Sequence, residues 1–355
     1  MSEKSNIIKF IQSLKTEYNE NELHFTNKQL QRTKVSKPYK GISILQNIPF
    51  TREALIKLEP IIEGGAEVTV TCPSFMEPDP ILIKAFIQSG GNFIELEKSE
   101  NKVFDIHLDC AAELLFKVPP KIGTVEITGT GSNKYRDTET NYPVISIDLC
   151  DIKNLEGTLG TGEAFVRAFK EITKQNIHNK PFMIFGYGKV GRGMAHYLKA
   201  DNAQVTIIDR DNSLLKKANN AGFETIQANN KVEVENAAEN MFCIATATGR
   251  ENIISDNYNT KTFKNKYLAN MGGDDEFGYH FKDDEVLCEK KPINFSTSVP
   301  TLLRYLDPVF YAHNMGIDLL LYSNLKNGLH PFPSFIAEET VQEWIKIFNE
   351  KIPSD

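Results

Sequence analysis

Apolar residues recur along this chain in two alternating patterns. From residue 41, short β-branched runs fall at 41–45, 66–72, 92–96, 104–110, 124–128 and 143–149, and each is typical of a buried strand. Helical spacing of apolar positions follows at 51–65 and 78–91, and both segments end in a glycine pair suited to a left-handed cap. Strands that alternate with helices predict βαβ units and a mostly parallel sheet.

The same alternation begins again after a helix predicted over 161–175. Strands are predicted at 182–186, 204–209, 223–227, 241–246 and 266–271. A long apolar-periodic segment at 301–325, a proline-rich turn at 329–335 and a short helix at 336–348 end the pattern. We therefore expect an α/β protein with a substrate and catalytic domain over 1–178, a Rossmann domain over 179–299, and a C-terminal helical segment over 300–355 that returns to the first domain.

A glycine-rich turn joins the first strand of the second domain to the next helix. Its glycines have the spacing G-x-G-x-x-G in "FMIFGYGKVGRG". The first permits a tight turn, the second lets backbone approach a pyrophosphate, and the third allows a helix to pack closely on a strand. The helix N-terminus offers N–H groups to the phosphates. The predicted cofactor residues of this turn are Gly186, Gly188, Lys189, Val190 and Gly191.

An acidic residue completes the pattern of a dinucleotide site. Asp209 ends the next strand, where a carboxylate binds the ribose hydroxyls of NAD. A G-x-G-x-x-G alone is a weak signal, but strand, helix and acid coincide here. Asp209 should repel a 2′-phosphate, which favours NAD over NADP. Arg210 beside it could accept that phosphate, so NADP stays open as the alternative.

Several segments together resemble the S-adenosylhomocysteine hydrolase family. "GYGKVGRGMAHYL" is similar to that family's phosphate turn, "IATATGRENII" to its T-T-G-x-x-x-I-I segment, and "LANMGGDDEF" to its x-N-x-G-H-x-D-x-E segment. Upstream, "GTVEITGTG" resembles its G-x-S-E-E-T-T-T-G loop, and "PVISIDLCDIK" resembles the strand that precedes its catalytic lysine. The resemblance covers roughly residues 40–310. It implies a two-domain hydrolase that holds NAD tightly as an internal oxidant.

The resemblance implies roles for individual residues. Lys153 matches the lysine that takes a proton from a substrate hydroxyl as hydride departs. Asp109 matches one acid of the family's aspartate pair, and Glu126 lies in the loop that supplies a substrate-binding glutamate, so all three are candidate catalytic residues. Thr51 falls where the family has a substrate-binding threonine. The resemblance also implies cofactor contacts for Thr128, Thr130, Thr246, Thr248, Gly249, Asn270 and Gly272.

The sequence departs from the family at several site positions. Three family histidines are replaced by Pro49, Val299 and Gly273. The second aspartate and two glycines that follow it are replaced by Cys110, Ala111 and Ala112. These departures favour an NAD-dependent hydrolase or lyase with an altered substrate. Two alternatives stay open: a conventional NAD-dependent dehydrogenase of a small hydroxy or amino acid or sugar, and a non-catalytic NAD-binding regulator.

Composition limits the partners. The formal net charge of the 355 residues is −7 without a dense basic block, so nucleic acid and anionic membranes are not expected partners. No apolar run approaches the ~20 residues of a membrane helix. Five scattered cysteines form no C-x-x-C pair or Cys/His cluster, and the acidic run 274–276 is interpreted as a solvated loop. We expect a cytoplasmic, disulfide-free, metal-free enzyme that uses NAD on a small molecule; a homo-oligomer is left open.

Overall fold

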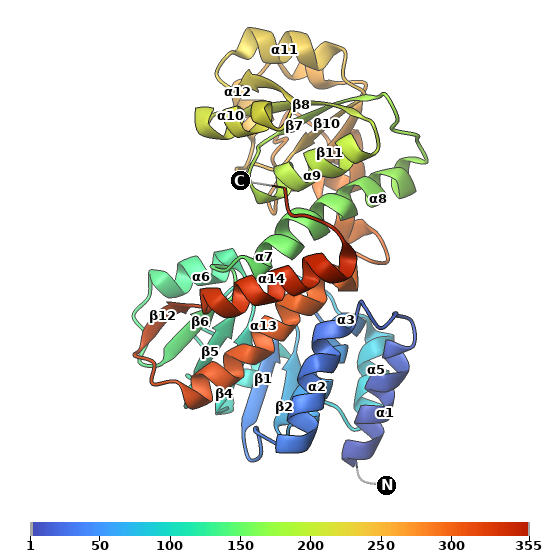
Figure 1. Ribbon diagram of the computed structural model, residues 1–355. Coiled ribbons are helices and arrows are strands. Elements are labelled where there is room, and N and C mark those ends of the chain that lie inside the picture. Colours follow the sequence, from blue (N-terminus) through green and yellow to red (C-terminus); the bar gives the residue numbers. More distant parts are fainter. Residues whose placement is uncertain (1–2, 354–355) are drawn as a thin grey trace. The chain divides into compact units, whose positions relative to one another are not determined.

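The structure is a computed structural model that describes residues 3–353 (Figure 1). Its contacts divide the chain into two compact units. The first comprises the residues up to Leu155 together with Leu303–Glu350, and the second comprises Glu156–Leu302 and residues 351–353. The division falls at Leu155 and not at the predicted residue 178, because helix α8 (Thr161–Thr173) packs against α9 (Lys189–Ala200) of the second unit.

The first unit is built on a seven-stranded sheet in the order β12-β6-β5-β4-β1-β2-β3. Every neighbouring pair is parallel, which confirms the α/β class predicted from the alternation of strands and helices. The strands are β1 Ser43–Asn47, β2 Glu67–Thr71, β3 Asn92–Phe93, β4 Ile106–Asp109, β5 Gly123–Glu126, β6 Pro143–Ser146 and β12 Gly328–Pro331.

Strand β12 overlaps the start of the segment 329–335 that the sequence predicts as a proline-rich turn. It joins the sheet edge beside β6, where Gly328 N donates to Tyr142 O (3.1 Å) and Phe332 N donates to Ser146 O (3.1 Å). An edge strand tolerates Pro331 because only one side of the strand needs donors. The sequence pattern gives no β-branched residue here, so the pairing with β6 is what creates this strand.

Helices cover this sheet. Helix α13 contacts β5, β6 and α2, and Figure 1 shows it, in orange, lying across the strands of the first unit. A Cβ on Gly316 would lie 2.5 Å from Val125 Cγ1, so glycine is needed where α13 approaches β5. The helices are α1 Glu3–Lys15, α2 His24–Ser36, α3 Arg52–Ile56, α4 Glu59–Glu63, α5 Pro80–Gln88, α6 Gly129–Arg136, α7 Ile152–Asn154, α13 Leu303–Tyr322 and α14 Ser334–Phe348.

The helix predicted over 51–65 is two short helices, α3 and α4. Pro60 stands in the first turn of α4, where its missing N–H costs no helical hydrogen bond. The same proline could not continue α3, so the chain turns between them. The segment ends at Gly65, whose φ of 101° is the left-handed conformation that the glycine pair predicts.

A carboxylate from α13 caps α2. The residue before α2, Leu23, has no side chain that can cap the helix. Asp307 takes that place: its carboxylate accepts hydrogen bonds from Phe25 N (2.7 Å), Thr26 N (3.1 Å) and Thr26 Oγ1 (2.5 Å). Burial raises the pKa of Asp307 to about 6. The helices are thus joined by a buried acid more than 280 residues from its donors.

The second unit has a five-stranded parallel sheet in the order β11-β10-β7-β8-β9. The first strand, β7, lies in the middle and the order reverses there, which is the arrangement of a Rossmann domain. The strands are β7 Pro181–Phe185, β8 Gln204–Asp209, β9 Glu224–Gln227, β10 Cys243–Thr246 and β11 Tyr267–Asn270. The remaining helices are α10 Asn212–Asn220, α11 Lys231–Glu239 and α12 Ile253–Asn257.

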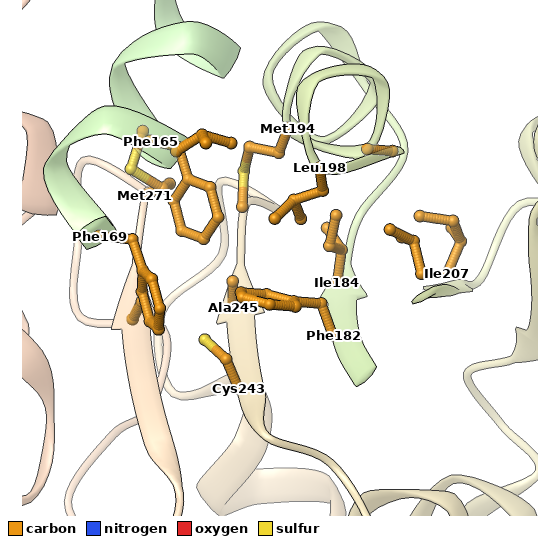
Figure 2. Packing of buried hydrophobic residues seen from close by; sticks show 14 of the residues in the cluster. Phe165, Phe169, Phe182, Ile184, Met194, Leu198, Ile207, Cys243, Ala245 and Met271 are labelled. Carbon is orange, nitrogen blue, oxygen red and sulfur yellow. The ribbon is translucent and has the colours of Figure 1, made fainter. Parts of the chain in front are cut away.

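One core of this unit lies between the sheet and helices α8 and α9. Figure 2 shows Phe165 and Phe169 of α8 and Met194 and Leu198 of α9 beside the strand residues Phe182, Ile184, Cys243 and Ala245. The rings of Phe169 and Phe182 pack edge to face with centroids 5.3 Å apart. Burying each of these phenylalanines contributes about 2 kcal/mol. Helix α8 therefore belongs to the second unit by its packing.

Two negative findings concern the described part of the chain. Within residues 3–353, no helix is both long and apolar enough to span a membrane. Within the same residues, no three His, Cys, Asp or Glu side chains gather as a metal site would require. All five cysteines are free thiols.

Candidate functional site

The glycine-rich turn lies between β7 and α9, where the sequence predicts it. Gly186 has a φ of 96°, a conformation that residues with a side chain rarely adopt. A Cβ on Gly186 would also lie 2.5 Å from the carbonyl oxygen of Ala247, so the turn needs glycine for space as well as for its backbone angle. Gly186 N donates to Ile208 O (2.8 Å), which ties the turn to β8.

Gly191 lets α9 approach the turn closely. A Cβ on this residue would lie 1.9 Å from the carbonyl oxygen of Gly186 and 3.6 Å from Ile184 Cγ2. No real Cβ is found so near a backbone oxygen, so the first turn of α9 could not take this place with any other residue. The third glycine of the motif is therefore required by packing, as the motif predicts.

Gly188 leaves open space at the start of α9. No atom lies within 4 Å of the position that its Cβ would take, and the residue is exposed. No side-chain hydrogen bond caps this helix end, which begins with Lys189 and Val190, and its positive dipole end favours an anion. An open position at an uncapped helix N-terminus fits the pyrophosphate of a dinucleotide.

The carboxylate of Asp209 is fixed beside the glycine-rich turn. Its Oδ2 accepts from Tyr187 N (2.8 Å) and its Oδ1 accepts from Asp211 N (2.9 Å). Each oxygen keeps a further lone pair for a ribose hydroxyl. The neighbouring Arg210 has an exposed side chain, and its carbonyl oxygen accepts from Gln227 Nε2 (2.9 Å).

Thr246 and Asn270 end the neighbouring strands β10 and β11. Both are fully buried, and Thr246 Oγ1 donates to Asn270 Oδ1 (3.1 Å). The same Oδ1 accepts from Gly272 N (3.0 Å), while Nδ2 donates to Asp274 O (2.8 Å) and Lys290 O (2.7 Å). Asn270 therefore organises the loop after β11, and its amide is satisfied by protein atoms.

Sequence reasoning missed Glu276. The acidic run 274–276 is interpreted above as a solvated loop, which is wrong for Glu276, because that residue is fully buried. Its carboxylate accepts hydrogen bonds from Thr248 N (2.9 Å), Thr248 Oγ1 (2.9 Å) and Gly249 N (2.6 Å). The motif x-N-x-G-H-x-D-x-E gave no direct signal, because with Asn270 as its asparagine the final glutamate falls on Phe277, one residue after Glu276.

Asp109 and Glu126 form a buried pair in the first unit. They end β4 and β5 and face each other in the parallel register. Asp109 accepts from Asn47 Nδ2 (3.1 Å), Leu114 N (3.1 Å) and the Tyr135 hydroxyl (2.8 Å). Burial raises the pKa of both carboxyls, and the nearby charge of Asp109 raises the pKa of Glu126 further. The pair can hold a proton at neutral pH.

The carboxylate of Glu126 also holds a strained turn. It accepts from Ala111 N (3.2 Å), Ala112 N (2.9 Å) and the hydroxyl of Thr128 (2.6 Å). The two alanines have φ values of 61° and 54°, the left-handed conformation that suits the glycines they replace. Thr128 caps α6 by accepting from Gly131 N (3.1 Å), and Thr130 is exposed in the first turn of that helix.

The other two predicted residues of the first unit lie at helix starts. Thr51 caps α3, with its Oγ1 accepting from Ala54 N (3.2 Å). Lys153 lies half-buried in α7. Two buried bases lie in the same unit: Lys57 Nζ donates to Gln46 Oε1 (2.8 Å), and His313 Nε2 lies 2.9 Å from Val125 O. Burial holds the pKa of each well below its ordinary value, and the Lys57 and Lys153 charges lower that of His313 further.

Comparison with known proteins identifies the second unit. Residues 158–285 match the S-adenosyl-L-homocysteine hydrolase NAD-binding domain. The chain is 26% identical to S-inosyl-L-homocysteine hydrolase of Methanocaldococcus jannaschii over 68% of this chain and 63% of that protein. It is 24% identical to adenosylhomocysteinase of Thermoplasma acidophilum over 73% of this chain and 66% of that protein. The second unit is thus similar to the NAD-binding domain of the S-adenosylhomocysteine hydrolase family.

These likenesses confirm the family resemblance of this unit and the cofactor that the sequence predicts. The matched domain is an NAD-binding domain, and the open glycine-rich cradle fits that group, so the cofactor of this S-adenosylhomocysteine hydrolase relative is NAD. The chain spans less than two thirds of the length of the relatives named above. A dipicolinate synthase from Bacillus halodurans shares the fold, with a TM-score of 0.50 and 13% identity over 79% of this chain and 98% of that one.

Replacing Asp209 by alanine should weaken NAD binding about tenfold to a hundredfold, because a charge-assisted hydrogen bond to the ribose is lost. Titration calorimetry with NAD measures the change. Asp211→Ala is the matched control: Asp211 is exposed and caps α10 through Ser213 N (2.7 Å), so its loss weakens only the start of that helix and leaves NAD affinity unchanged. Equal affinities of the Asp209 variant and the wild type would contradict the assignment.

Proposed function

We propose that the chain is an NAD-dependent enzyme that oxidises a substrate hydroxyl transiently, promotes elimination or addition at a nearby carbon, and reduces the ketone again. The observation that carries this proposal is the open cradle at Gly188, with Asp209 fixed beside it in a domain that matches the hydrolase family. Bound NAD supplies the hydride acceptor and, at the end, the hydride donor. The net reaction consumes no oxidant, so the enzyme turns over without releasing NADH.

Three groups of the first unit supply the proton chemistry in this proposal. Lys153 takes the proton of the substrate hydroxyl as hydride leaves the same carbon. The buried pair of Asp109 and Glu126 keeps a proton at neutral pH, which lets one of them protonate a leaving group. The raised pKa of both carboxyls supports this role, since an acid must still carry its proton at the working pH.

The substrate class follows from the named relatives and from the replaced histidines. The relatives hydrolyse S-inosyl- or S-adenosyl-homocysteine by name, so we propose a nucleoside thioether or a compound of similar chemistry. Gly273, which replaces a family histidine, is exposed, and no atom lies within 4 Å of its Cβ position. Without an imidazole there, recognition or proton transfer must differ, which supports an altered substrate.

The first experiment is to identify the nucleotide that accompanies the purified protein by mass spectrometry and absorbance. The protein is then incubated with S-inosyl-homocysteine and, separately, S-adenosyl-homocysteine, and free thiol and NADH are followed together. Thiol release without NADH accumulation is the expected result with at least one thioether. A protein that arrives without nucleotide and acts only when NAD is added would exclude the internal-oxidant proposal.

A conventional dehydrogenase is the second candidate, and the same replacements favour it. Pro49, Val299 and Gly273 remove three imidazoles that the hydrolysis steps of the family would use, whereas simple hydride transfer needs one base. A dehydrogenase would release NADH in a one-to-one ratio with oxidised product. A panel of hydroxy acids, amino acids and sugars with exchangeable NAD tests it, and no NADH with any of them would exclude it.

Replacing Lys153 by methionine should lower kcat by about a hundredfold to ten-thousandfold, because the base for the hydroxyl proton is lost. NAD affinity should stay unchanged, since the groups that bind the cofactor in this proposal are the glycine-rich turn and Asp209. Lys121→Met is the control, because its ammonium lies at the surface and pairs with Asp105 (3.0 Å). A Lys153 variant with full activity would refute the assigned role and favour a regulator.

A further inference from the structure

The loop after β10 is held by a carboxylate that belongs to another loop. Glu276 follows β11 and is fully buried, and its Oε2 accepts from both N and Oγ1 of Thr248 (2.9 Å each). Its Oε1 accepts from Gly249 N (2.6 Å). Three donors from two successive residues therefore converge on one carboxylate. Those two amides are satisfied by Glu276, so they are not the groups that bind the cofactor.

The backbone around Glu276 is itself anchored. Asn252 N donates to Asp275 O (2.8 Å), Ile254 N donates to Glu276 O (3.2 Å), and Ser255 N donates to Phe277 O (3.2 Å). These bonds fix three successive residues along the start of α12. A flexible solvated loop would not supply such an anchor, so the carboxylate has a defined position.

Gly272 gives this carboxylate its space. A Cβ on Gly272 would lie 2.1 Å from Glu276 Oε1 and 2.7 Å from its Cδ. The predicted cofactor role of Gly272 therefore has an alternative physical cause, because the glycine is needed where Glu276 crosses the loop. The same residue pair explains why this loop combines a glycine with a buried acid.

The loop that Glu276 holds packs directly on the phosphate turn. A Cβ on Gly186 would lie 2.5 Å from Ala247 O and 3.3 Å from Thr248 Cα, so these groups are in close contact with Gly186. On its other side Gly186 meets Gly191, at the start of α9. The first glycine of the turn is thus enclosed between the helix and the loop that Glu276 fixes. A shift of that loop would move Gly186 directly.

We propose that Glu276 is a positioning residue of the NAD site, which sets the shape of the pyrophosphate turn by holding residues 247–249 against Gly186. The inference rests on the proposed function, because it concerns the same NAD site. It also predicts that different residues control binding of the two halves of the cofactor. The pyrophosphate half should depend on Glu276, whereas the adenosine half should depend on Asp209, whose carboxylate is fixed through Tyr187 and Asp211 instead.

The test is Glu276→Gln in the full chain. The amide keeps the shape of the side chain but turns one acceptor into an NH2 group that faces N–H donors, which leaves a buried donor unsatisfied. We expect the Kd for NAD and for ADP-ribose to rise about tenfold or more, while the Kd for adenosine changes less than about twofold. Calorimetry measures the first two ligands and NMR titration the third.

Asp275→Asn is the matched control one residue away. Asp275 Oδ1 accepts from Phe277 N (3.0 Å) and Gly278 N (2.9 Å), and its Oδ2 pairs with Lys290 (2.9 Å), so these side-chain bonds support the same segment and none of them goes to residues 247–249. We expect its NAD affinity to match the wild type. An equal loss of NAD and adenosine binding in the Glu276 variant would show a general structural role and overturn the proposal.

Two further outcomes separate the possible failures. If the wild type binds neither NAD nor ADP-ribose, the proposed function fails; if it binds both and Glu276→Gln binds them equally well, only this inference fails. Should the variant not fold, hydrogen exchange of the wild type decides the question. The amides of Thr248 and Gly249 should exchange slowly in the free protein, and rapid exchange of both would overturn the proposal.

Discussion

Gly191→Ala should unfold the NAD-binding unit or cost it about 3 kcal/mol or more. The new Cβ would lie 1.9 Å from the Gly186 carbonyl oxygen, and a backbone atom cannot move aside as a side chain can. The first turn of α9 would have to lift away from β7, which also opens the core between α9 and the sheet. Thermal unfolding followed by circular dichroism, together with NAD calorimetry, measures both effects.

The matched variant is Gly188→Ala, three residues earlier in the same turn. Its Cβ would meet no atom within 4 Å, and its φ of −72° suits alanine, so we expect stability to change by less than about 0.5 kcal/mol. NAD affinity should nevertheless fall at least about tenfold, because the methyl group fills the space of the pyrophosphate. Two stable, NAD-binding alanine variants would show that the turn is not a phosphate cradle.

Asp307→Ala should destabilise the first unit by about 3 kcal/mol, since it leaves three donors of Phe25 and Thr26 buried without an acceptor. Chemical denaturation at neutral pH measures the loss. Asp79→Ala is the control: Asp79 caps α5 at an exposed site through Ile81 N (2.8 Å), where water can replace the carboxylate, and about 1 kcal/mol is expected. Equal losses in the two variants would contradict the role of burial.

The Asp307 carboxyl also predicts a pH dependence with a definite sign. Burial raises its pKa in the folded state from 3.8 to about 6, so the part of its contribution to stability that depends on its proton is fully present below pH 3.8 and is lost as the pH rises through about 6. The wild type should therefore gain stability relative to Asp307→Asn when the pH is lowered from 7.5 to 4.5. A difference between the two proteins that stays constant over this range would rule out the raised pKa.

The succession of strands along the chain and the phosphate turn were predictable from the sequence because local patterns specify them. Buried parallel strands need continuous β-branched runs, and a pyrophosphate turn needs glycines at fixed spacing, so both leave a signal within a few residues. The NAD cofactor and the α/β class follow from these signals. The boundary of the first domain does not follow from such local signals, because the amphipathic pattern of α8 would be the same on either unit. Only the contacts of α8 with α9 assign it to the second unit.

What the sequence by itself determined is the cofactor and the kind of sheet that carries it. The tertiary structure decided which acids are buried and what they hold: Glu276 fixes the loop beside Gly186, Asp307 caps α2 from α13, and Glu126 holds a turn in the left-handed conformation. The sequence shows only that a residue is Asp or Glu, and it is the same whether the carboxylate lies in a solvated loop or in a core. The hydrogen-bond partners of these buried carboxylates are mainly backbone N–H groups, which every residue except proline carries. The sequence therefore does not show where such donors converge.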